Sequence, residues 1–85
     1  MTRGPQGRTP QRGLGKAIRF LRDEARLTQE ALAGQSGVSA SWISRIEHGE
    51  VDPTWATIAQ IAEALAVSVE SLAELAEDFE ETNAR

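Results

Sequence analysis

The residues best equipped for recognition chemistry lie close together between positions 39 and 48. When this stretch is drawn as a helix, Ser41, Ser44 and Arg45 point away from Ile43 and Ile46. The fork of the arginine can donate two hydrogen bonds to guanine O6 and N7, but it can equally grip a phosphate. Such groups can hold a ligand by hydrogen bonds.

Catalytic and metal-binding groups are scarce along the chain. The 85 residues include a single histidine, His48, and no cysteine. The sequence contains neither a phosphate-binding loop nor a paired-ligand motif. We therefore expect that the chain is not an enzyme and has no metal site and no cofactor. The lack of cysteine also excludes disulfides.

The recognition residues belong to a two-helix pattern at positions 29–48. Leu32 and Ala33 are the inward positions of a first short helix, and Gly37 stands where a tight turn between helices favours positive φ. Val38 closes the corner before the second helix. This pattern is typical of a helix-turn-helix unit, whose second helix enters the major groove of DNA. Two ordinary antiparallel core helices are the alternative explanation.

The net charge of −4 is divided unevenly between the two halves of the chain. Residues 1–48 carry eight basic and four acidic side chains, whereas residues 49–85 carry one basic and nine acidic side chains. A basic half that contains the two-helix pattern is compatible with nucleic acid, and an acidic half discourages non-specific binding. For the last ten residues, a solvated acidic tail explains the charge equally well.

Helical spacing extends over most of the chain, and no strand pattern is present. Residues 1–12 combine glycine, proline and arginine with almost nothing apolar, so we expect a disordered basic arm. A first helix is predicted over about 13–25. The expected N-caps of four later helices are Thr28, Ser39, Thr54 and Ser68. The folded domain should span residues 13–80, with a flexible tail at 81–85.

The fourth predicted helix is apolar on a broad face, and we expect it to be largely buried. That face consists of Trp55, Ile58, Ala59, Ile61, Ala62 and Leu65. No apolar stretch of the sequence is long enough to span a membrane, and the N-terminal residues do not follow the pattern of a signal peptide. A cytoplasmic location is the simplest expectation.

Residues from about 14 to 75 resemble the phage-repressor/Cro-type helix-turn-helix domains, also called the xenobiotic-response-element (XRE) family. The resemblance is carried by an ordered set of motifs: Arg22, LTQEALA at 27–33, Gly37-Val38, ISRIE at 43–47, Gly49, Pro53 and IAEALAVS at 61–68. It implies an all-α, five-helix repressor-type helix-turn-helix domain. It also implies a homodimer that binds double-stranded DNA at a two-fold operator.

The resemblance also suggests which residues meet DNA. The residues expected to face base edges are Ala40, Ser41, Ser44 and Arg45. Those expected to contact phosphates are Gln29, Ser39, Trp42 and Arg19. Each of the second group has an ordinary explanation as a surface, capping or packing residue. Arg22 and Glu47 should form a structural ion pair that ties the first helix to the recognition helix.

Three positions depart from the common pattern of the family. Arg26 and Ala66 stand where glycine is frequent, at helix ends with positive φ, and each should cost about 1 kcal/mol unless the turn adjusts. Ser36 occupies a position that is usually apolar. None of the three removes an expected DNA contact, so we expect them to affect stability more than function.

The last predicted helix carries an apolar stripe that continues further than a small core requires. Leu75, Ala76 and Phe79 are therefore expected to form a dimer interface. The alternative is packing against the first helix within one chain.

Two classes of function are compatible with the sequence. The first is a sequence-specific DNA-binding transcriptional regulator, most simply a repressor that binds a pseudo-palindromic operator as a dimer. The second is an antitoxin or another protein-interaction module that uses the same fold and needs a protein partner, which could bind the acidic last helix.

Overall fold

The computed structural model describes residues 12–83, and within this range the chain forms five helices and no strand. The helices are α1 (Arg12–Glu24), α2 (Gln29–Ser36), α3 (Ala40–Glu47), α4 (Trp55–Ala64) and α5 (Val69–Asn83). The expected all-α fold is confirmed. The predicted arm lies outside the described residues except for Arg12, which begins α1. The last helix continues past residue 80, where the sequence suggested that the folded domain ends.

The helices begin where hydrogen-bonding side chains can cap them. The four capping oxygens, which accept backbone N–H groups at 3.0–3.2 Å, belong to Thr28, Ser39, Thr54 and Ser68. Each cap of this kind contributes about 1 kcal/mol. The first helix starts differently, because the N–H of Gly13 donates to Glu80 of α5 at 2.6 Å. That contact joins residues too far apart in the chain for local pattern to predict it.

The turns between helices rely on positive φ values. Gly37 ends α2 with φ of 80°, and its N–H donates to the Ala33 carbonyl, which sharpens the turn into α3. Arg26 and Ala66 adopt φ of 60° and 62°, as the family pattern suggested. Because side chains with a Cβ disfavour this region, both turns carry a local conformational cost.

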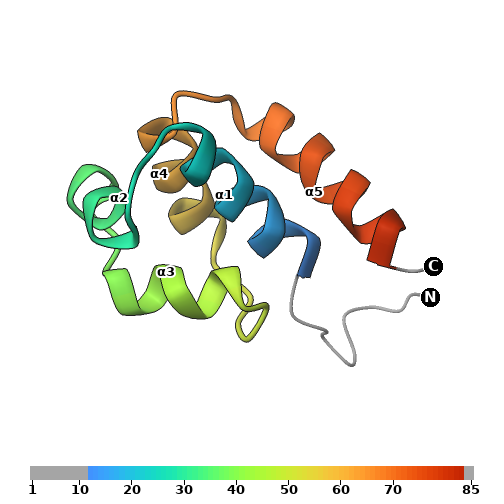
Figure 1. The fold of residues 1–85 in the computed structure, drawn as a ribbon, viewed down its shortest axis with the longest axis horizontal. Coiled ribbons are helices and arrows are strands. Elements are labelled where there is room, and N and C mark those ends of the chain that lie inside the picture. The colour runs from blue at the N-terminus through green and yellow to red at the C-terminus, as the bar shows by residue number, and fades with distance from the viewer. Residues whose placement is uncertain (1–11, 84–85) are drawn as a thin grey trace.

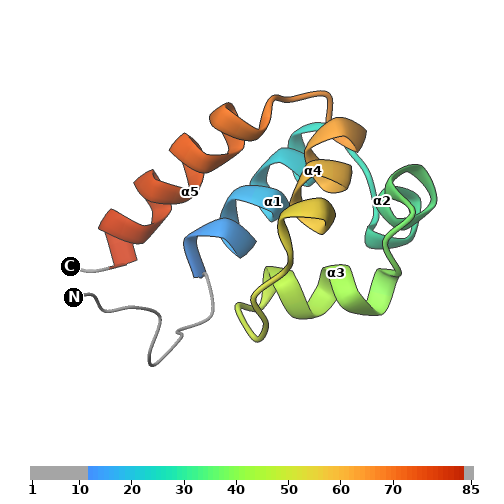
Figure 2. The same ribbon diagram turned by 180° about the vertical axis from the view of Figure 1, so that it is seen from behind.

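Helix α1 lies at the centre of the fold (Figures 1 and 2). In both views α5 runs beside α1, while α2, α3 and α4 gather on its other sides. The largest fully buried side chains come from all five helices: Ile18, Leu32, Ile43, Ile46, Ile61 and Leu72. Ser36 is also buried, and its hydroxyl accepts the N–H of Val38 at 3.1 Å.

The approach of α1 to α3 is close because a glycine stands at the crossing. A Cβ added to Gly15 would lie 2.3 Å from the carbonyl oxygen of Ile46, at the end of α3. Any side chain at this position would push the two helices apart. This close contact fixes α3 against α1.

The prediction that Trp55 is buried is wrong, since 70% of this residue is exposed. It is the first residue of α4, where the described chain leaves most of its surface uncovered, whereas Ile61 and Ala62 further along are buried. No described helix alone is long and apolar enough to cross a membrane. Only α4 and the following helix to Glu80, taken together across a bend of 101°, have the length and composition for a span.

Candidate nucleic-acid interface

Helix α3 is anchored on one side and open on the other. Ile43 and Ile46 are 0% and 1% exposed, and Val38 packs at the corner that precedes them. At its N-terminus, Ser39 accepts the N–H of Trp42. The helix therefore cannot turn about its own axis without exposing two isoleucines to water, a cost of several kcal/mol.

The residues predicted to meet bases share the open side of this helix. Ser41 and Arg45 are exposed, and Ala40 and Ser44 are half-buried. Their spacing places them on neighbouring turns of one helical face. The exposed side of α3 thus offers two hydroxyls, one small apolar group and one guanidinium.

Arg45 has two neighbours that sequence reasoning missed. Its guanidinium carbon lies 5.2 Å from the ring centroid of Trp42, in a cation–π arrangement. Its Nε lies 3.7 Å from a carboxylate oxygen of Glu50. The first neighbour is one turn away on the same helix and could have been inferred from spacing. The second depends on the turn that follows α3.

A buried charge network connects α1, α2 and α3. Arg22 donates to both carboxylate oxygens of Glu47, at 2.7 Å from Nε and 3.0 Å from Nη2. The side chains are 12% and 3% exposed. The hydrogen bond from Arg22 to Glu47 raises the pKa of the arginine, against the lowering effect of burial. Arg22 also donates to the Leu27 carbonyl at 2.8 Å, so it closes the turn between α1 and α2 as well.

Gln29 is the third member of this network. Its Nε2 donates to Glu47 at 3.0 Å, which brings the first residue of α2 against the end of α3. An amide has two N–H groups, and a single one is needed for this bond. Of the other residues predicted to touch phosphate, Ser39 and Trp42 lie at the start of α3, next to the exposed face.

Arg19 stands apart from the residues on α2 and α3. It lies on α1, and its Nε is 3.9 Å from Asp23 one turn later, with both side chains more than 60% exposed. No hydrogen bond or ion pair within residues 12–83 links it to α3. An exposed pair of this kind contributes little to stability.

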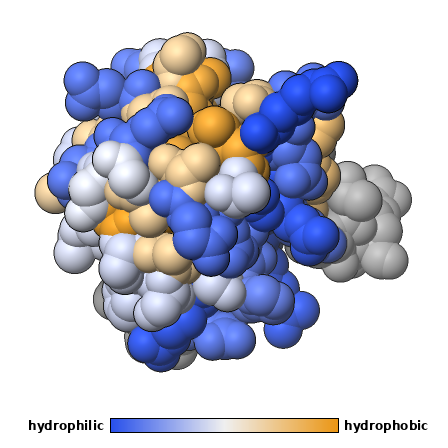
Figure 3. All heavy atoms as spheres, turned by 60° about the vertical axis from the view of Figure 1, so that its left-hand side comes forward, coloured by the Kyte–Doolittle hydropathy of each residue, from blue (hydrophilic) through white to orange (hydrophobic). Residues whose placement is uncertain are grey.

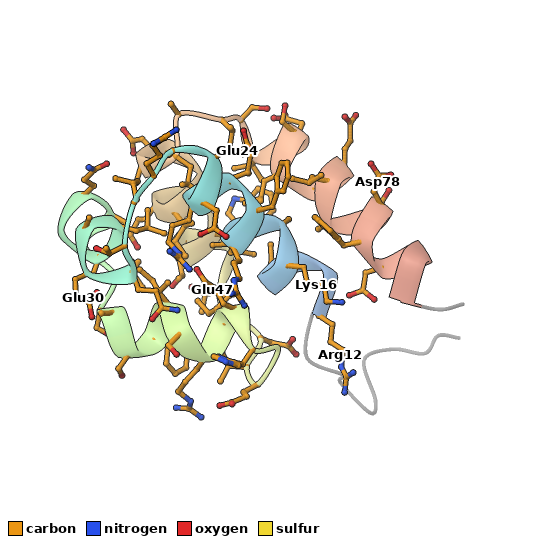
Figure 4. The ribbon with its side chains drawn as sticks, in the orientation of Figure 1. Arg12, Lys16, Glu24, Glu30, Glu47 and Asp78 are labelled. Carbon is orange, nitrogen blue, oxygen red and sulfur yellow. The ribbon has the colours of Figure 1, made fainter. Side chains whose placement is uncertain are left out.

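A basic hollow of about 360 Å³ lies where α1 begins and α3 ends. It is lined by Arg12, Lys16, Glu47, His48 and Gly49. Figure 4 shows Arg12 extending from α1 on the side where α3 lies, whereas Glu24 and Asp78 lie on the opposite side. The positive charge near α3 is thus supplemented by the start of α1, and the acidic residues of Figure 4 on that opposite side face away from it.

The side of the molecule that carries α2 is mostly hydrophilic, with smaller hydrophobic areas (Figure 3). A more apolar groove of about 370 Å³ lies elsewhere, between the start of α4 and α5. Trp55, Ile58, Val69 and Leu72 line it, and its acidic residues include Glu77. Within residues 12–83, no group of three or more histidine or carboxylate side chains is placed to hold a metal ion.

The three residues expected at a dimer interface differ in how far the single chain buries them. Ala76 is buried in the core of the single chain, which leaves it almost no surface for a second copy. Phe79 packs on Phe20 of α1, with ring centroids 6.2 Å apart. Leu75 is half-buried, and Phe20 remains 45% exposed. Phe79 therefore packs against the first helix within the same chain, as the alternative expectation stated.

The known proteins to which the chain is similar in sequence include two repressors. The chain is 51% identical over 59 residues to the HTH-type transcriptional repressor RghR of Bacillus subtilis, covering 68% of this chain and 44% of RghR. It is 32% identical over 59 residues to the immunity repressor protein of Bacillus phage phi105, covering 69% and 41%. The chain thus spans less than half the length of these relatives. Their names are those of repressors, in agreement with the expectation that the chain is not an enzyme.

Solved structures of regulators share the fold. The restriction-modification controller protein C.AhdI from Aeromonas hydrophila aligns with a TM-score of 0.71 and 31% identity, over 73% of this chain and 94% of its own. The clp gene regulator ClgR from Corynebacterium glutamicum aligns with a TM-score of 0.79 and 28% identity, over 87% and 80%. The family model for the helix-turn-helix domain matches residues 14–75. Since this match covers most of the chain, the protein belongs to the helix-turn-helix domain family.

Proposed function

We propose that this domain binds double-stranded DNA sequence-specifically and acts as a transcriptional regulator, most simply a repressor. The observation that carries the proposal is α3 itself, whose apolar side is anchored in the core and whose open side presents Ser41, Ser44 and Arg45. A helix held in this way can enter the major groove without rearranging the scaffold. The repressor names of RghR and the phage protein support the same role.

In the proposed complex, phosphate contacts set the register and base contacts set the preference. Gln29 and Ser39 would donate to phosphates from the starts of α2 and α3, with the indole N–H of Trp42 beside them. Arg19 would add a contact from α1. The start of α1, which lies beside the end of α3, would supply further positive charge through Arg12 and Lys16.

The base readers offer limited direct information. Arg45 can recognise guanine with its fork, and Ala40 can only contact a thymine methyl or leave space. Ser41 and Ser44 carry hydroxyls that accept or donate and so discriminate poorly. We therefore expect the shape and deformability of the DNA to supply part of the specificity.

A dimer on a pseudo-palindromic operator is part of the proposal, with half-sites about 34 Å apart. Since Ala76 is buried in the core, the surface we propose for the second copy is formed by Leu75 and Phe79 of α5, extended by the exposed part of Phe20. A regulator of this kind works where the chromosome lies, so we place it in the cytoplasm.

A protein-interaction module, such as an antitoxin, is the second candidate. The observation that favours it is the groove with the exposed Trp55, which has apolar walls and acidic residues such as Glu77. A partner segment with apolar and basic side chains would fit this groove. This function does not exclude DNA binding, but it requires a second protein chain.

Selection of duplexes from a random DNA pool, followed by titration of the selected duplex at several salt concentrations, tests the first candidate against the second. A DNA-binding regulator should recover a two-fold site, and its affinity should fall steeply as salt rises. If folded protein enriches no site, the protein-interaction module becomes the better explanation. Sedimentation of the free protein would then test the proposed dimer separately.

A further inference from the structure

The guanidinium of Arg45 is held from two directions before any ligand arrives. The ring of Trp42 lies under it at 5.2 Å, and a carboxylate oxygen of Glu50 lies 3.7 Å from Nε. The side chains of Arg45 and Glu50 are 53% and 57% exposed, so this pair stands at the surface that would face DNA. An acidic residue at such a position repels phosphates and needs an explanation if the surface binds DNA.

The backbone explains how Glu50 reaches Arg45. Gly49 has φ of 72°, and its N–H donates to the carbonyl of Ile46 at 3.0 Å. The next N–H, that of Glu50, donates to the carbonyl of Arg45 at 3.0 Å. These two hydrogen bonds turn the chain back along the end of α3. The carboxylate is therefore placed by a turn with internal hydrogen bonds and not by a long unsupported loop.

The contact with Glu50 involves Nε, on the stem side of the guanidinium. The two terminal nitrogens at the far end form the fork that donates to guanine O6 and N7. Because Glu50 lies next to Nε, Arg45 can direct its two terminal nitrogens toward a base while the carboxylate stays in place. A bidentate guanine contact would then add two hydrogen bonds without requiring that the existing pair be lost.

A phosphate contact differs from a guanine contact in its electrostatic energy. A phosphate at the same fork would be a second anion beside Arg45, and the carboxylate of Glu50 would repel it from a few ångströms away. Electrostatic contacts of this kind provide nearly all of the affinity for non-specific DNA. The carboxylate should therefore weaken non-specific binding more than binding to the correct site.

We propose that Glu50 and Trp42 are positioning residues that make Arg45 a selective reader of guanine instead of a general phosphate contact. Trp42 supports the plane of the guanidinium, and Glu50 occupies the stem side. The inference rests on the proposed DNA-binding function and assigns a specificity role at the same site. Since the pair is exposed, its effect on each affinity should be modest.

The variant Glu50→Gln removes the charge and keeps the shape of the side chain. Its matched control is Glu24→Gln, which changes the net charge equally on the side of the molecule away from α3. Dissociation constants are measured for both variants and the unaltered protein. The probes are the duplex selected from the random pool, the same duplex with single guanines replaced, and a non-operator duplex, each at several salt concentrations.

For Glu50→Gln, we expect the affinity for non-operator DNA to rise about fivefold. The slope of the logarithm of the affinity against the logarithm of the salt concentration should become steeper by about the value of one phosphate contact. Affinity for the selected duplex should change less, so the ratio of the affinity for the selected duplex to the affinity for non-operator DNA should fall. Replacement of one guanine in the selected duplex should reduce the affinity of this variant less than it reduces the affinity of the unaltered protein. The control should leave that ratio unchanged. Equal shifts on all duplexes, as in the control, would overturn the role of Glu50 while leaving DNA binding intact. Unaltered protein that prefers no duplex would overturn both proposals.

Discussion

Substitution of Arg22 by methionine tests how strongly α1 holds α3 in place. The change keeps most of the volume and removes two hydrogen bonds to Glu47, whose side chain is 3% exposed. Gln29 would be the remaining donor to that carboxylate within the described residues. Breaking a buried pair by removing one partner costs about 3–5 kcal/mol, because the other charge stays buried.

That loss is large for a domain of this size. Natural domains have about 0.05–0.15 kcal/mol of stability per residue, which gives roughly 4–13 kcal/mol for this chain. The variant should thus lose a quarter of its stability or more, and its melting temperature should fall by at least about 12 °C. Urea unfolding followed by circular dichroism at low temperature measures the free energy of unfolding directly.

Two further variants make this test decisive. Arg19→Met removes an exposed arginine from the same helix, where it pairs with Asp23 at 3.9 Å, and should cost less than about 1 kcal/mol. The double variant Arg22→Met with Glu47→Leu removes both buried charges and should regain most of the stability. If Arg22→Met costs no more than Arg19→Met, the network does not anchor α3 and the reasoning is refuted.

The other predictions concern single sites. Arg45→Ala should weaken binding to the selected duplex by about tenfold to a hundredfold and relax the preference at one base pair per half-site; a uniform loss on all duplexes would identify a phosphate contact. Ala66→Gly should raise the free energy of unfolding by about 1 kcal/mol, because glycine relieves the cost of φ at 62°; no gain in urea titrations would show that the turn is unstrained. Gly15→Ala should cost about 1–3 kcal/mol, since the added Cβ meets the Ile46 carbonyl, whereas Gly34→Ala, with nothing within 4 Å, should be neutral or stabilising. The hydrogen bond to Glu47 raises the pKa of Arg22 further above its already high ordinary value, so the stabilisation from the charged arginine is lost only in strongly alkaline solution, as pH rises through the folded-state pKa. The stability deficit of Arg22→Met should therefore be the same at about pH 7 and about pH 9.

The parts of the fold that depend on local pattern could be predicted from the sequence. The capping oxygens of Thr28 and Ser39, the turn at Gly37 and the inward pair Ile43 and Ile46 all follow from residues within one or two turns of each other. Helical spacing and capping chemistry are short-range properties, so they need no knowledge of the tertiary fold.

The parts that depend on tertiary packing could not be predicted in the same way. Burial of Trp55 followed from periodicity, but periodicity does not say where covering helices end. The cap of Gly13 by Glu80 joins the two ends of the domain, and the stacking of Phe79 on Phe20 joins α5 to α1. Both contacts require the paths of two helices in space, which a single apolar stripe does not specify.

The candidate site shows the same division. Spacing placed Ser41, Ser44 and Arg45 on one face of the helix that became α3, and the structure has them there. The approach of Glu50 to Arg45 depends on the hydrogen-bonded turn at Gly49, and an isolated helix drawn from the sequence omits it. Spacing within one helix therefore predicts the exposed position of Arg45 more readily than it predicts the neighbours that contact it.

The most direct test of the central claim is to map the surface of the protein that contacts DNA. Backbone amide signals are followed by nuclear magnetic resonance while the duplex selected from the random pool is added. If α3 reads the major groove, the largest changes should fall on residues 39–45 and on the start of α2 near Gln29, with little change along the acidic face of α5. Changes centred on α5 and the groove around Trp55, with α3 unaffected, would contradict the account.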